Sequence, residues 1–371
     1  MTASKLRVLP FVGLLLPLDL TVSCIVIAVA IISIPLRFFR RRKPEELNRS
    51  IDISFITIQI LNWDGLHLLK ESLPSVYEAV RRHRDRTGAK HEVLVIDNGS
   101  RDGSVEFLQR NFPDVRVVAL DRNYGFSRGN NKGLEHVRSE IVVFLNNDMT
   151  VAPDFLQPLV EPFSDSSVFA VTSQVFFSDR ERQREETGKT RGQFERGFFR
   201  FWHDAVVLED EECPPLPVFW AGGGSCAMDV RKLRSLGGFD SLYHPFYVED
   251  VDVSYQAWKR GWRCLFAARS HVVHKHRGTS RPKFGDEYVD MTTRRNQFLF
   301  VWKNVTDTSL TLRHLINLPR IHASMIVQRS VPFEIRSYIG AIIRLPFAAW
   351  RRMANSRAYL RSDQEVLRFC K

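Results

Sequence analysis

The chain has 371 residues, of which 44% are hydrophobic and 26% are charged, so it is long and apolar enough to bury a sizeable core. This composition excludes a wholly disordered chain, a collagen-like chain and a membrane protein with many spanning helices. The 53 Lys and Arg residues outnumber the 42 Asp and Glu residues, and this excess favours contact with phosphates or an anionic membrane surface. The five cysteines are scattered without a C-x-x-C pair and predict neither a zinc ribbon nor a disulfide framework.

An apolar run lies near the start of the chain. Residues 11–34 contain a single charged residue, Asp19, and as a helix rising about 1.5 Å per residue they could cross a ~30 Å hydrocarbon layer. Several arginines follow the run and few basic residues precede it, so the positive-inside bias predicts a single-pass anchor with the rest of the chain on the cytoplasmic face. A cleaved signal peptide and a re-entrant hairpin bent at Pro17 and Asp19 are the alternatives.

Four short apolar runs, rich in β-branched residues, predict strands. They are residues 51–61, 92–96, 115–120 and 141–145. The segments between them carry apolar residues at helical spacing. Strands that alternate with helices indicate an α/β fold with a doubly wound, mostly parallel, Rossmann-like sheet, whose ligand site lies at the carboxyl ends of the strands.

Two later segments stand out by their charge. Residues 179–197 interrupt the apolar pattern and predict a mobile loop or insertion that could close over a ligand. Residues 337–361 mix large apolar side chains with five arginines, which predicts a helix lying on a membrane surface or an amphipathic helix packed on the domain. We expect a membrane anchor with a basic flank in residues 1–45, a catalytic domain in 46–304 and a basic helical tail in 305–371.

Polar residues follow three of the predicted strands. They form the sequences NWDG from Asn62, DNGSRDGS from Asp97 and NND from Asn146. Each of these residues alone is well explained as a turn or helix cap. Carboxylates and amides gathered at one partly desolvated sheet edge are costly unless they are hydrogen-bonded or hold a cation, so together they indicate a polar ligand site.

Seven motifs follow one another between about Ile53 and Asn304. They are ILNWDG, VIDNGSRDGS, NYGFSRGNN, FLNNDMTVAPDFL, AGGGSCAM, GGFDSLYHPFYVEDVDVSYQAWKRGW and the His-rich stretch before Gly278. In this order they resemble the family 2 glycosyltransferases, in particular the rhamnosyltransferase-like group with the GT-A fold. The resemblance implies an enzyme that transfers a sugar from a nucleotide diphosphate sugar.

The resemblance also implies a divalent cation, Mg or Mn, beside the donor diphosphate. The NND sequence occupies the position of the family's D-x-D motif, with Asp148 as the direct ligand and Asn146 in place of the first acid. His274 resembles the family's late histidine ligand, and His271 and His276 are the alternatives. A solvated surface cluster of histidines is the other interpretation, and because an amide is a neutral ligand, metal independence stays open.

The acids at the start of a predicted helix resemble the family's E-D motif. Its aspartate, here Asp250, is the base that takes the proton of the acceptor hydroxyl, with Glu249 as its orienting partner. Acids at a helix amino terminus are favoured by the helix dipole alone, so capping is the alternative role. We place Asp252 in the sugar or acceptor site, together with the glycines of AGGGS. These are Gly222, Gly223 and Gly224.

Asp97 resembles the family's acid that hydrogen-bonds a pyrimidine base, with a turn cap as the alternative. We expect further residues to line the nucleotide or phosphate site. They are Asn62, Trp63, Asn98, Arg128, Asn130 and Asn147. Arg295 and Asn296 lie in a similarly family-like segment, where a cation near the diphosphate and an ordinary surface charge are both plausible.

These residues predict a membrane-associated, metal-dependent, inverting glycosyltransferase of the hexosyltransferase type. Its donor would be a pyrimidine nucleotide sugar, for which the resemblance suggests dTDP-rhamnose, and its acceptor a hydroxyl of a glycan or lipid-linked molecule in cell-surface polysaccharide synthesis. The alternative is a non-catalytic sugar-nucleotide-binding or membrane assembly protein with the same fold. A Rossmann dehydrogenase is excluded because no G-x-G-x-x-G follows the first strand, and nucleic acid is not an expected partner because the basic residues gather near the apolar ends.

Overall fold

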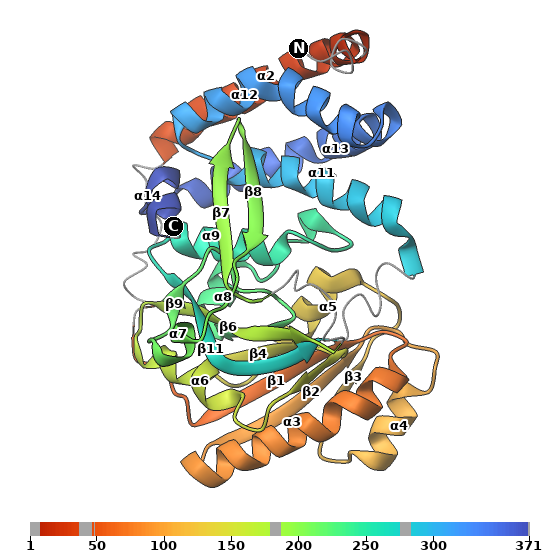
Figure 1. Cartoon of the computed structure of the whole chain (residues 1–371), viewed down its shortest axis with the longest axis vertical. Coiled ribbons are helices and arrows are strands. Elements are labelled where there is room, and N and C mark those ends of the chain that lie inside the picture. Colours follow the sequence, from red (N-terminus) through yellow and green to blue (C-terminus); the bar gives the residue numbers. More distant parts are fainter. Residues whose placement is uncertain (1–7, 37–46, 48, 179–186, 275–282, 370–371) are drawn as a thin grey trace.

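The computed structural model describes residues 8–36, 47, 49–178, 187–274 and 283–369. A mixed sheet with helices on both faces forms one half of the molecule, and a layer of long helices forms the other (Figure 1). The hairpin of β7 (Thr190–Glu195) and β8 (Phe198–His203) extends from the sheet toward the helical layer. The α/β architecture predicted from the sequence is confirmed.

The main sheet has the strand order β3-β2-β1-β4-β10-β6-β11-β5, and β9 pairs with β11. The four predicted strands are present and run parallel to one another. They are β1 (Phe55–Asn62), β2 (Lys90–Asp97), β3 (Arg116–Ala119) and β4 (Ile141–Asn146). Beyond β4, antiparallel pairs appear. The strands on this side are β5 (Met149–Val151), β6 (Val168–Phe177), β9 (Leu216–Pro217), β10 (Ser225–Asp229) and β11 (Arg263–His274).

Each face of the sheet is covered by helices. One hydrophobic cluster joins alternate residues of β1, such as Ile58, to Leu69 and Leu73 of α3, and a second cluster covers the opposite face with α5, α8 and α9. This alternation follows from the two-residue period of a strand. The helices around the sheet are α3 (Leu66–Thr87), α4 (Ser104–Asn111), α5 (Gly125–Leu134), α6 (Leu156–Val160), α7 (Glu209–Glu212), α8 (Val230–Leu236) and α9 (Glu249–Lys259). Two 3-10 turns, η2 (Glu161–Ser164) and η3 (Ser241–Tyr243), lie between them.

The helical layer combines the two ends of the described chain. It contains α2 (Leu9–Leu36), α11 (Asp286–Asn304), α12 (Thr308–Gln328), α13 (Val331–Ser356) and α14 (Asp363–Phe369). Helix α2 packs against α12 and α13 along a stripe with alternating spacings of three and four residues. The stripe consists of Val12, Leu15, Asp19, Val22, Val26, Val29 and Ser33. In the part of the chain that the structure describes, α2 is the one helix long and apolar enough to cross a membrane.

The apolar run forms the single helix expected from the sequence, and the alternative hairpin bend at Pro17 and Asp19 is absent because α2 continues as one helix past both residues. The Asp19 carboxylate is buried and accepts hydrogen bonds from the hydroxyl of Tyr338 at 2.7 Å and from the ring of His322 at 3.0 Å. Although burial opposes it, the hydrogen bonds to Asp19 and Glu334 raise the pKa of His322. A charge that would be costly in lipid is therefore satisfied inside the helical layer.

The charged segment 179–197 differs from its prediction as a mobile loop. Residues 179–186 lie outside the described residues, but residues 190–195 form β7, which pairs with β8. Phe194 packs against Phe199, and the Gly197 carbonyl accepts a hydrogen bond from His314 Nδ1 at 2.8 Å. These apolar and polar contacts hold the second half of the segment in a β-hairpin, which its charged composition did not indicate.

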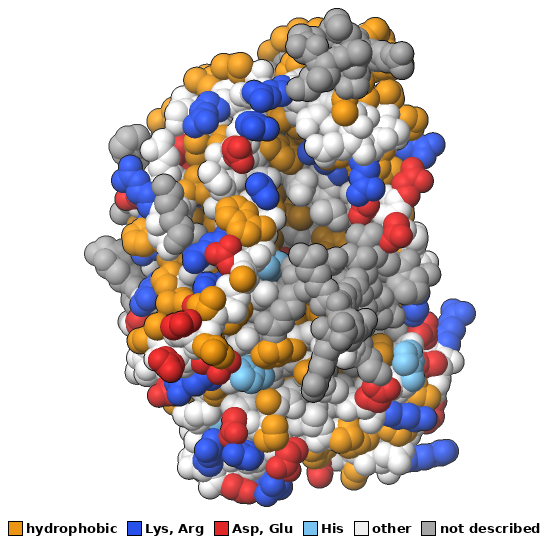
Figure 2. Space-filling view, in the orientation of Figure 1, with side chains coloured by type: hydrophobic (Ala, Val, Ile, Leu, Met, Phe, Trp, Pro, Cys, Tyr) orange, Lys and Arg blue, Asp and Glu red, His pale blue; other side chains and the backbone are white. Residues whose placement is uncertain are grey.

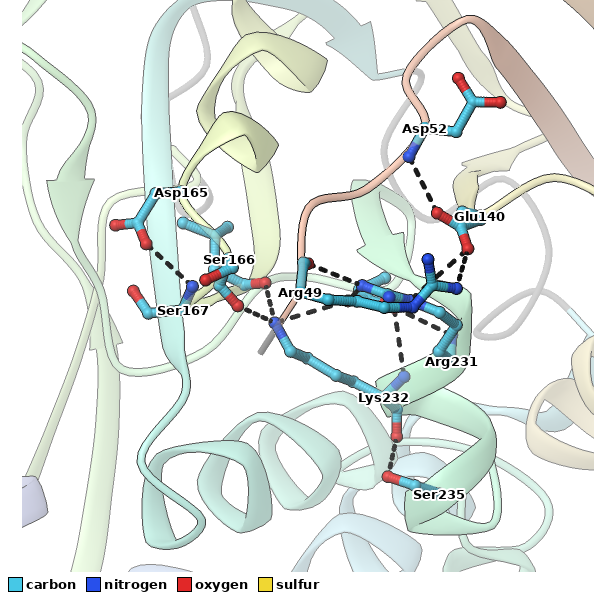
Figure 3. Close-up of polar contacts among 11 residues, drawn as sticks. Arg49, Asp52, Glu140, Asp165, Ser166, Ser167, Arg231, Lys232 and Ser235 are labelled. Carbon is cyan, nitrogen blue, oxygen red and sulfur yellow. Dashed lines mark hydrogen bonds and ion pairs between the residues drawn. The ribbon is translucent and has the colours of Figure 1, made fainter. Parts of the chain in front are cut away.

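A polar network joins α8 to the chain segments at the amino ends of β4 and β6 (Figure 3). Lys232, which is fully buried, donates hydrogen bonds to the carbonyls of Ser166 at 2.6 Å and Val168 at 2.7 Å. Its ammonium also lies 3.4 Å from the Asp229 carboxylate, and Asp229 pairs with Arg231 as well. These contacts tie α8 to the beginning of β6.

Candidate active site

Three predicted nucleotide-site residues meet at the carboxyl edge of the sheet. The register pairs Asn62 with Asp97 across β1 and β2, and β4 brings Asn147 to the same edge. Asn62 Nδ2 donates to Asp97 Oδ1 at 3.1 Å, and Asn147 Nδ2 donates to Asn62 Oδ1 at 2.8 Å. Asp97 Oδ2 also accepts from the amide of Ser100 at 2.9 Å. The cluster is buried and holds the Asp97 carboxylate in a fixed orientation.

The other predicted nucleotide neighbours have different environments. Trp63 lies at the surface of the same edge, with Lys283 Nζ 3.6 Å from the centre of its ring, and Arg128 is exposed on α5. Asn98 and Asn130 are also buried and hydrogen-bonded within the protein, and their part in a nucleotide site stays a prediction. Asn98 accepts from the amide of Tyr124, and Asn130 donates to the carbonyl of Phe126, so both hold the start of α5 in place.

The predicted metal ligands Asp148 and His274 are neighbours. Pairing of β11 with β5 places His274 opposite Met149, and its Nε2 lies 3.2 Å from Asp148 Oδ2. His271, the first alternative, instead pairs with Glu211 at 3.2 Å, and the second alternative, His276, lies outside the described residues. Of the described histidines, the geometry therefore places His274 beside the NND sequence.

The Asp148 environment fits a divalent cation. Asp148 is only 8% exposed, yet its Oδ1 has no hydrogen-bond partner among the described residues, which is costly unless a ligand supplies one. A carboxylate oxygen and an imidazole nitrogen suit Mn as well as Mg. No group of three or more His, Cys, Asp and Glu side chains surrounds one point within the described ranges, so diphosphate oxygens would have to complete the coordination.

The glycine run connects this metal-site candidate to the predicted base. The amide of Asn146 donates to the carbonyl of Gly224 at 2.8 Å, and the amide of Gly223 donates to Asp250 Oδ2 at 3.2 Å. Side chains would not fit here, since a methyl group at Gly224 would lie 2.6 Å from Asn146 Nδ2. The third glycine, Gly222, has open space around it. The close backbone approach thus brings Asn146 and Asp250 to the same part of the molecule.

Helix α9 begins with two acids in contrasting environments. Asp250 is partly exposed, and its Oδ1 accepts a hydrogen bond from the amide of Val251 at 2.8 Å. Glu249 is buried, and its Oε2 has no hydrogen-bond partner. Burial, with a smaller contribution from the nearby charge of Asp250, raises the pKa of Glu249 well above its usual value. Solvent access makes Asp250 the better placed of the two to take a proton from a bound alcohol.

Asp252 differs from its prediction as a sugar or acceptor residue. Its carboxylate is fully buried and points into the protein, where it accepts a hydrogen bond from the Tyr243 hydroxyl at 2.7 Å. It also accepts from Lys303 at 2.6 Å and from Asn304 at 2.6 Å. Asp252 is two residues from Asp250, and this spacing places the two side chains on different faces of α9. It therefore joins α9 to α11.

Residues 243–248, here called the catalytic loop, lead directly into Glu249. Tyr247 and Val248 have φ values of 70° and 77°, which are unfavourable for residues with a Cβ. Asn296 of α11 holds this loop, because its Nδ2 lies 2.8–2.9 Å from the carbonyls of Tyr243, Phe246 and Tyr247. The sequence marked Asn296 only as part of a family-like segment beside Arg295, and in the structure its buried amide holds the backbone that precedes Glu249 and Asp250.

Comparison with known proteins identifies the class of this domain. Residues 68–209 match the family model described as Glycosyl transferase family 2. This part of the chain is therefore similar to the family 2 glycosyltransferases, and the sheet and helices form the GT-A fold.

Two curated relatives and one solved structure illustrate the similarity. Polypeptide N-acetylgalactosaminyltransferase 11 of Xenopus tropicalis is 26% identical over 218 residues, which are 55% of this chain and 36% of that protein. N-acetylglucosaminyl-diphospho-decaprenol L-rhamnosyltransferase of Mycobacterium tuberculosis (strain CDC 1551 / Oshkosh) is 24% identical over 213 residues, 49% of this chain and 66% of that protein. The crystal structure of GalNAc-T7 with UDP, GalNAc and Mn2+ has a TM-score of 0.52 at 19% identity, and the match covers 67% of this chain and 48% of that one. The aligned part thus spans about a third of the length of the first relative.

Proposed function

We propose that the protein is a membrane-associated, inverting glycosyltransferase that uses a pyrimidine nucleotide diphosphate sugar. The observation that carries this proposal is the convergence of Asp97, Asp148 and Asp250 on one edge of the sheet, linked by Asn62, Asn147 and the glycine run. A single displacement at an anomeric carbon is assisted by a base beside the acceptor and by stabilisation of the departing diphosphate, and a carboxylate beside the pyrimidine would position the donor.

The residues then have distinct tasks. Asp97 would accept a hydrogen bond from the ring N–H of the pyrimidine, and the glycine run would let the donor sugar approach the backbone. Asp148 and His274 would hold a divalent cation, which when bound neutralises charge on the diphosphate leaving group. Asp250 would take the acceptor's hydroxyl proton while that oxygen attacks the anomeric carbon and the bond to the diphosphate breaks on the opposite side.

The acceptor class and the membrane role are part of the proposal. The similarity to a relative named as a rhamnosyltransferase acting on N-acetylglucosaminyl-diphospho-decaprenol supports dTDP-rhamnose as the first donor to test and a lipid-linked sugar as the acceptor. The long apolar helix α2 supports membrane attachment, with the catalytic domain on the cytoplasmic face.

The decisive experiment is a donor panel with the purified full chain. Release of the nucleotide from dTDP-rhamnose, UDP-sugars and GDP-mannose is measured with Mg or Mn, with and without a membrane lipid extract. We expect a pyrimidine donor to be consumed faster when the extract is present, and the product to have the inverted anomeric configuration. A chain that binds and consumes none of these donors would contradict the proposed function.

A further inference from the structure

A cluster of basic side chains lies beside the catalytic loop. Arg295 of α11 donates from Nη2 to the carbonyl of His244 at 2.7 Å. The His244 ring lies against Gly125 at the start of α5, where a methyl group would be 2.9 Å from its Nδ1. On the other side, the Arg295 stem packs against Gly340 of α13, and Arg344 donates to the Gly340 carbonyl at 3.4 Å. Helices α5, α11 and α13 thus meet the loop at this point.

Within the part of the chain that the structure describes, the three arginines of this cluster have no carboxylate partners. Neither Arg295 nor Arg344, nor Arg128 one turn into α5, forms an ion pair with any carboxylate in the described residues. Burial, assisted by the charge of Arg344, lowers the pKa of Arg295 to about 10. Burial and then the charges of Arg128, Arg344 and Arg295 lower the pKa of His244. Partly buried like charges destabilise one another unless an anion lies between them.

Nearby arginines on the same two helices are paired, which makes this cluster unusual. Arg294 of α11 forms two hydrogen bonds with the Glu334 carboxylate at 2.8 and 3.0 Å. Arg351 of α13 pairs with Asp240 at 2.7 Å. Arg294 and Arg351 thus each have a carboxylate partner, whereas no ion pair with a carboxylate is found for Arg295 and Arg344 within the described residues.

An exposed apolar stripe runs along α13 next to Arg344. Ile339, Ile343, Phe347 and Trp350 recur at helical spacing and are 42–68% exposed. Phe347 lies one turn after Arg344, so the apolar and basic surfaces are adjacent on the helix. Helix α13 also packs against α2, whose outward side chains are apolar. Figure 2 shows hydrophobic side chains along the upper rim of the molecule, over α2 and α12, with basic side chains just below.

Building on the proposed function, we propose that Arg295, Arg344, His244 and Arg128 bind the phosphate of a lipid-linked acceptor. The hydrocarbon chain of this acceptor lies on the α13 stripe, and its sugar extends along the catalytic loop to Asp250. Guanidinium groups suit this role because they form paired, charge-assisted hydrogen bonds with phosphate oxygens. In this proposal the phosphate of the acceptor has its own residues, different from Asp148 and His274, which we assign to the donor diphosphate.

The test uses the full chain in a non-ionic detergent and dodecyl phosphate as the probe. Calorimetry compares Arg344→Gln with Arg336→Gln, a matched change at an exposed arginine on the same helix. We expect Arg344→Gln to weaken dodecyl phosphate binding by about tenfold, because it removes one charge-assisted hydrogen bond. Arg336→Gln should leave this binding unchanged. Both variants should bind UDP and dTDP as the parent does. Ile343→Asn should weaken binding of dodecyl phosphate but not of butyl phosphate.

Three results would overturn the proposal. Equal affinity of the two arginine variants for dodecyl phosphate would remove Arg344 from a phosphate site. Loss of nucleotide binding in Arg344→Gln, with dodecyl phosphate unaffected, would assign the cluster to the donor. Equal affinity of the chain for dodecyl phosphate and for inorganic phosphate would show an anion site without a lipid. If dodecyl phosphate binds as expected but no donor is consumed, the cluster stands and the proposed function fails, so the two are separable.

Discussion

The two edges of the sheet differ in how the buried charged side chains described here are hydrogen-bonded. At the amino edge, the Lys232 ammonium is fully buried and is satisfied by two carbonyls and the Asp229 carboxylate. At the carboxyl edge, Asp148 Oδ1 and Glu249 Oε2 are buried without hydrogen-bond partners. The first arrangement stabilises the fold without needing anything else, and the second is incomplete until a ligand is present. Buried polar atoms without a hydrogen-bond partner among the described residues also occur elsewhere, including Arg231 Nη1 at the amino edge, so those of Asp148 and Glu249 indicate a site only together with the motif residues around them.

The same contrast occurs within helix α9. Asp252 is saturated by hydrogen bonds from Tyr243, Lys303 and Asn304, so it contributes to packing. Asp250 shares the helix but is partly exposed beside Gly223. Changes at the carboxyl edge should therefore affect chemistry more than stability, and changes at the amino edge should do the reverse.

The largest effect should follow Asp250→Asn, which removes the proposed base but keeps the size of the side chain. We expect transfer to fall by at least about 100-fold, the contribution typical of a general base, while the affinity for the donor nucleotide and the thermal midpoint stay near those of the parent. Transfer is measured with saturating donor, and nucleotide affinity by calorimetry. Full activity in this variant would exclude Asp250 as the base.

The amino edge is tested by Lys232→Met. This change leaves the carbonyls of Ser166 and Val168 without their donor and weakens the compensation of Asp229, so we expect it to lower the free energy of unfolding by about 3 kcal/mol. Arg49→Ala is the matched control, because its exposed pair with Glu140 should contribute less than about 1 kcal/mol. Urea unfolding measures both. A Lys232→Met protein as stable as the parent would contradict the difference between the edges.

A smaller effect is expected from Asp148→Asn. The isosteric amide should weaken the Mn-dependent part of nucleotide binding by about 100-fold, or ~2.7 kcal/mol, because it removes the negative charge beside the cation. Calorimetric titrations with and without Mn separate this part from the rest. Asp165→Asn, a change of an exposed acid at the amino edge, serves as the control. An unchanged Mn dependence in Asp148→Asn would remove Asp148 from the metal site.

The sequence predicted the parts of this molecule whose signal is local. The β-branched runs identified β1 to β4, and the motifs identified Asp97, Asp148 and Asp250 before any contact between them was known. The pairing of His274 with Asp148 depends on the register of β11 against β5, which no local pattern specifies. The motif alone therefore did not decide which of three histidines is the candidate metal ligand.

The errors have a common physical cause. Asp252 looks like a site residue in sequence because it lies within a functional motif, but tertiary packing turned its side chain inward, toward Tyr243, Lys303 and Asn304. The basic cluster around Arg344 was missed because its members come from distant segments that meet only in the fold. Whether the hydrogen-bonding groups of a polar residue have partners within the protein depends on its neighbours in space. A single sequence does not specify these neighbours.

The smallest effect concerns Glu249 and the dependence of stability on pH. Burial raises its pKa in the folded protein above the value of 4.5 expected for the unfolded chain. Above pH 4.5, Glu249 is therefore deprotonated in the unfolded chain while it still holds its proton in the folded protein. The free energy of unfolding then falls as the pH rises toward the pKa of Glu249 in the folded protein. Glutamine does not titrate, so Glu249→Gln should not lose free energy of unfolding in this way as the pH rises. We expect the variant to gain stability relative to the parent between pH 4.5 and neutral pH, and to show no such gain below pH 4.5. Urea unfolding at pH 4 and pH 7 measures the difference. If the variant is less stable than the parent at pH 7, the buried carboxylate at the carboxyl edge stabilises the fold as Asp252 does, and the contrast within α9 is lost.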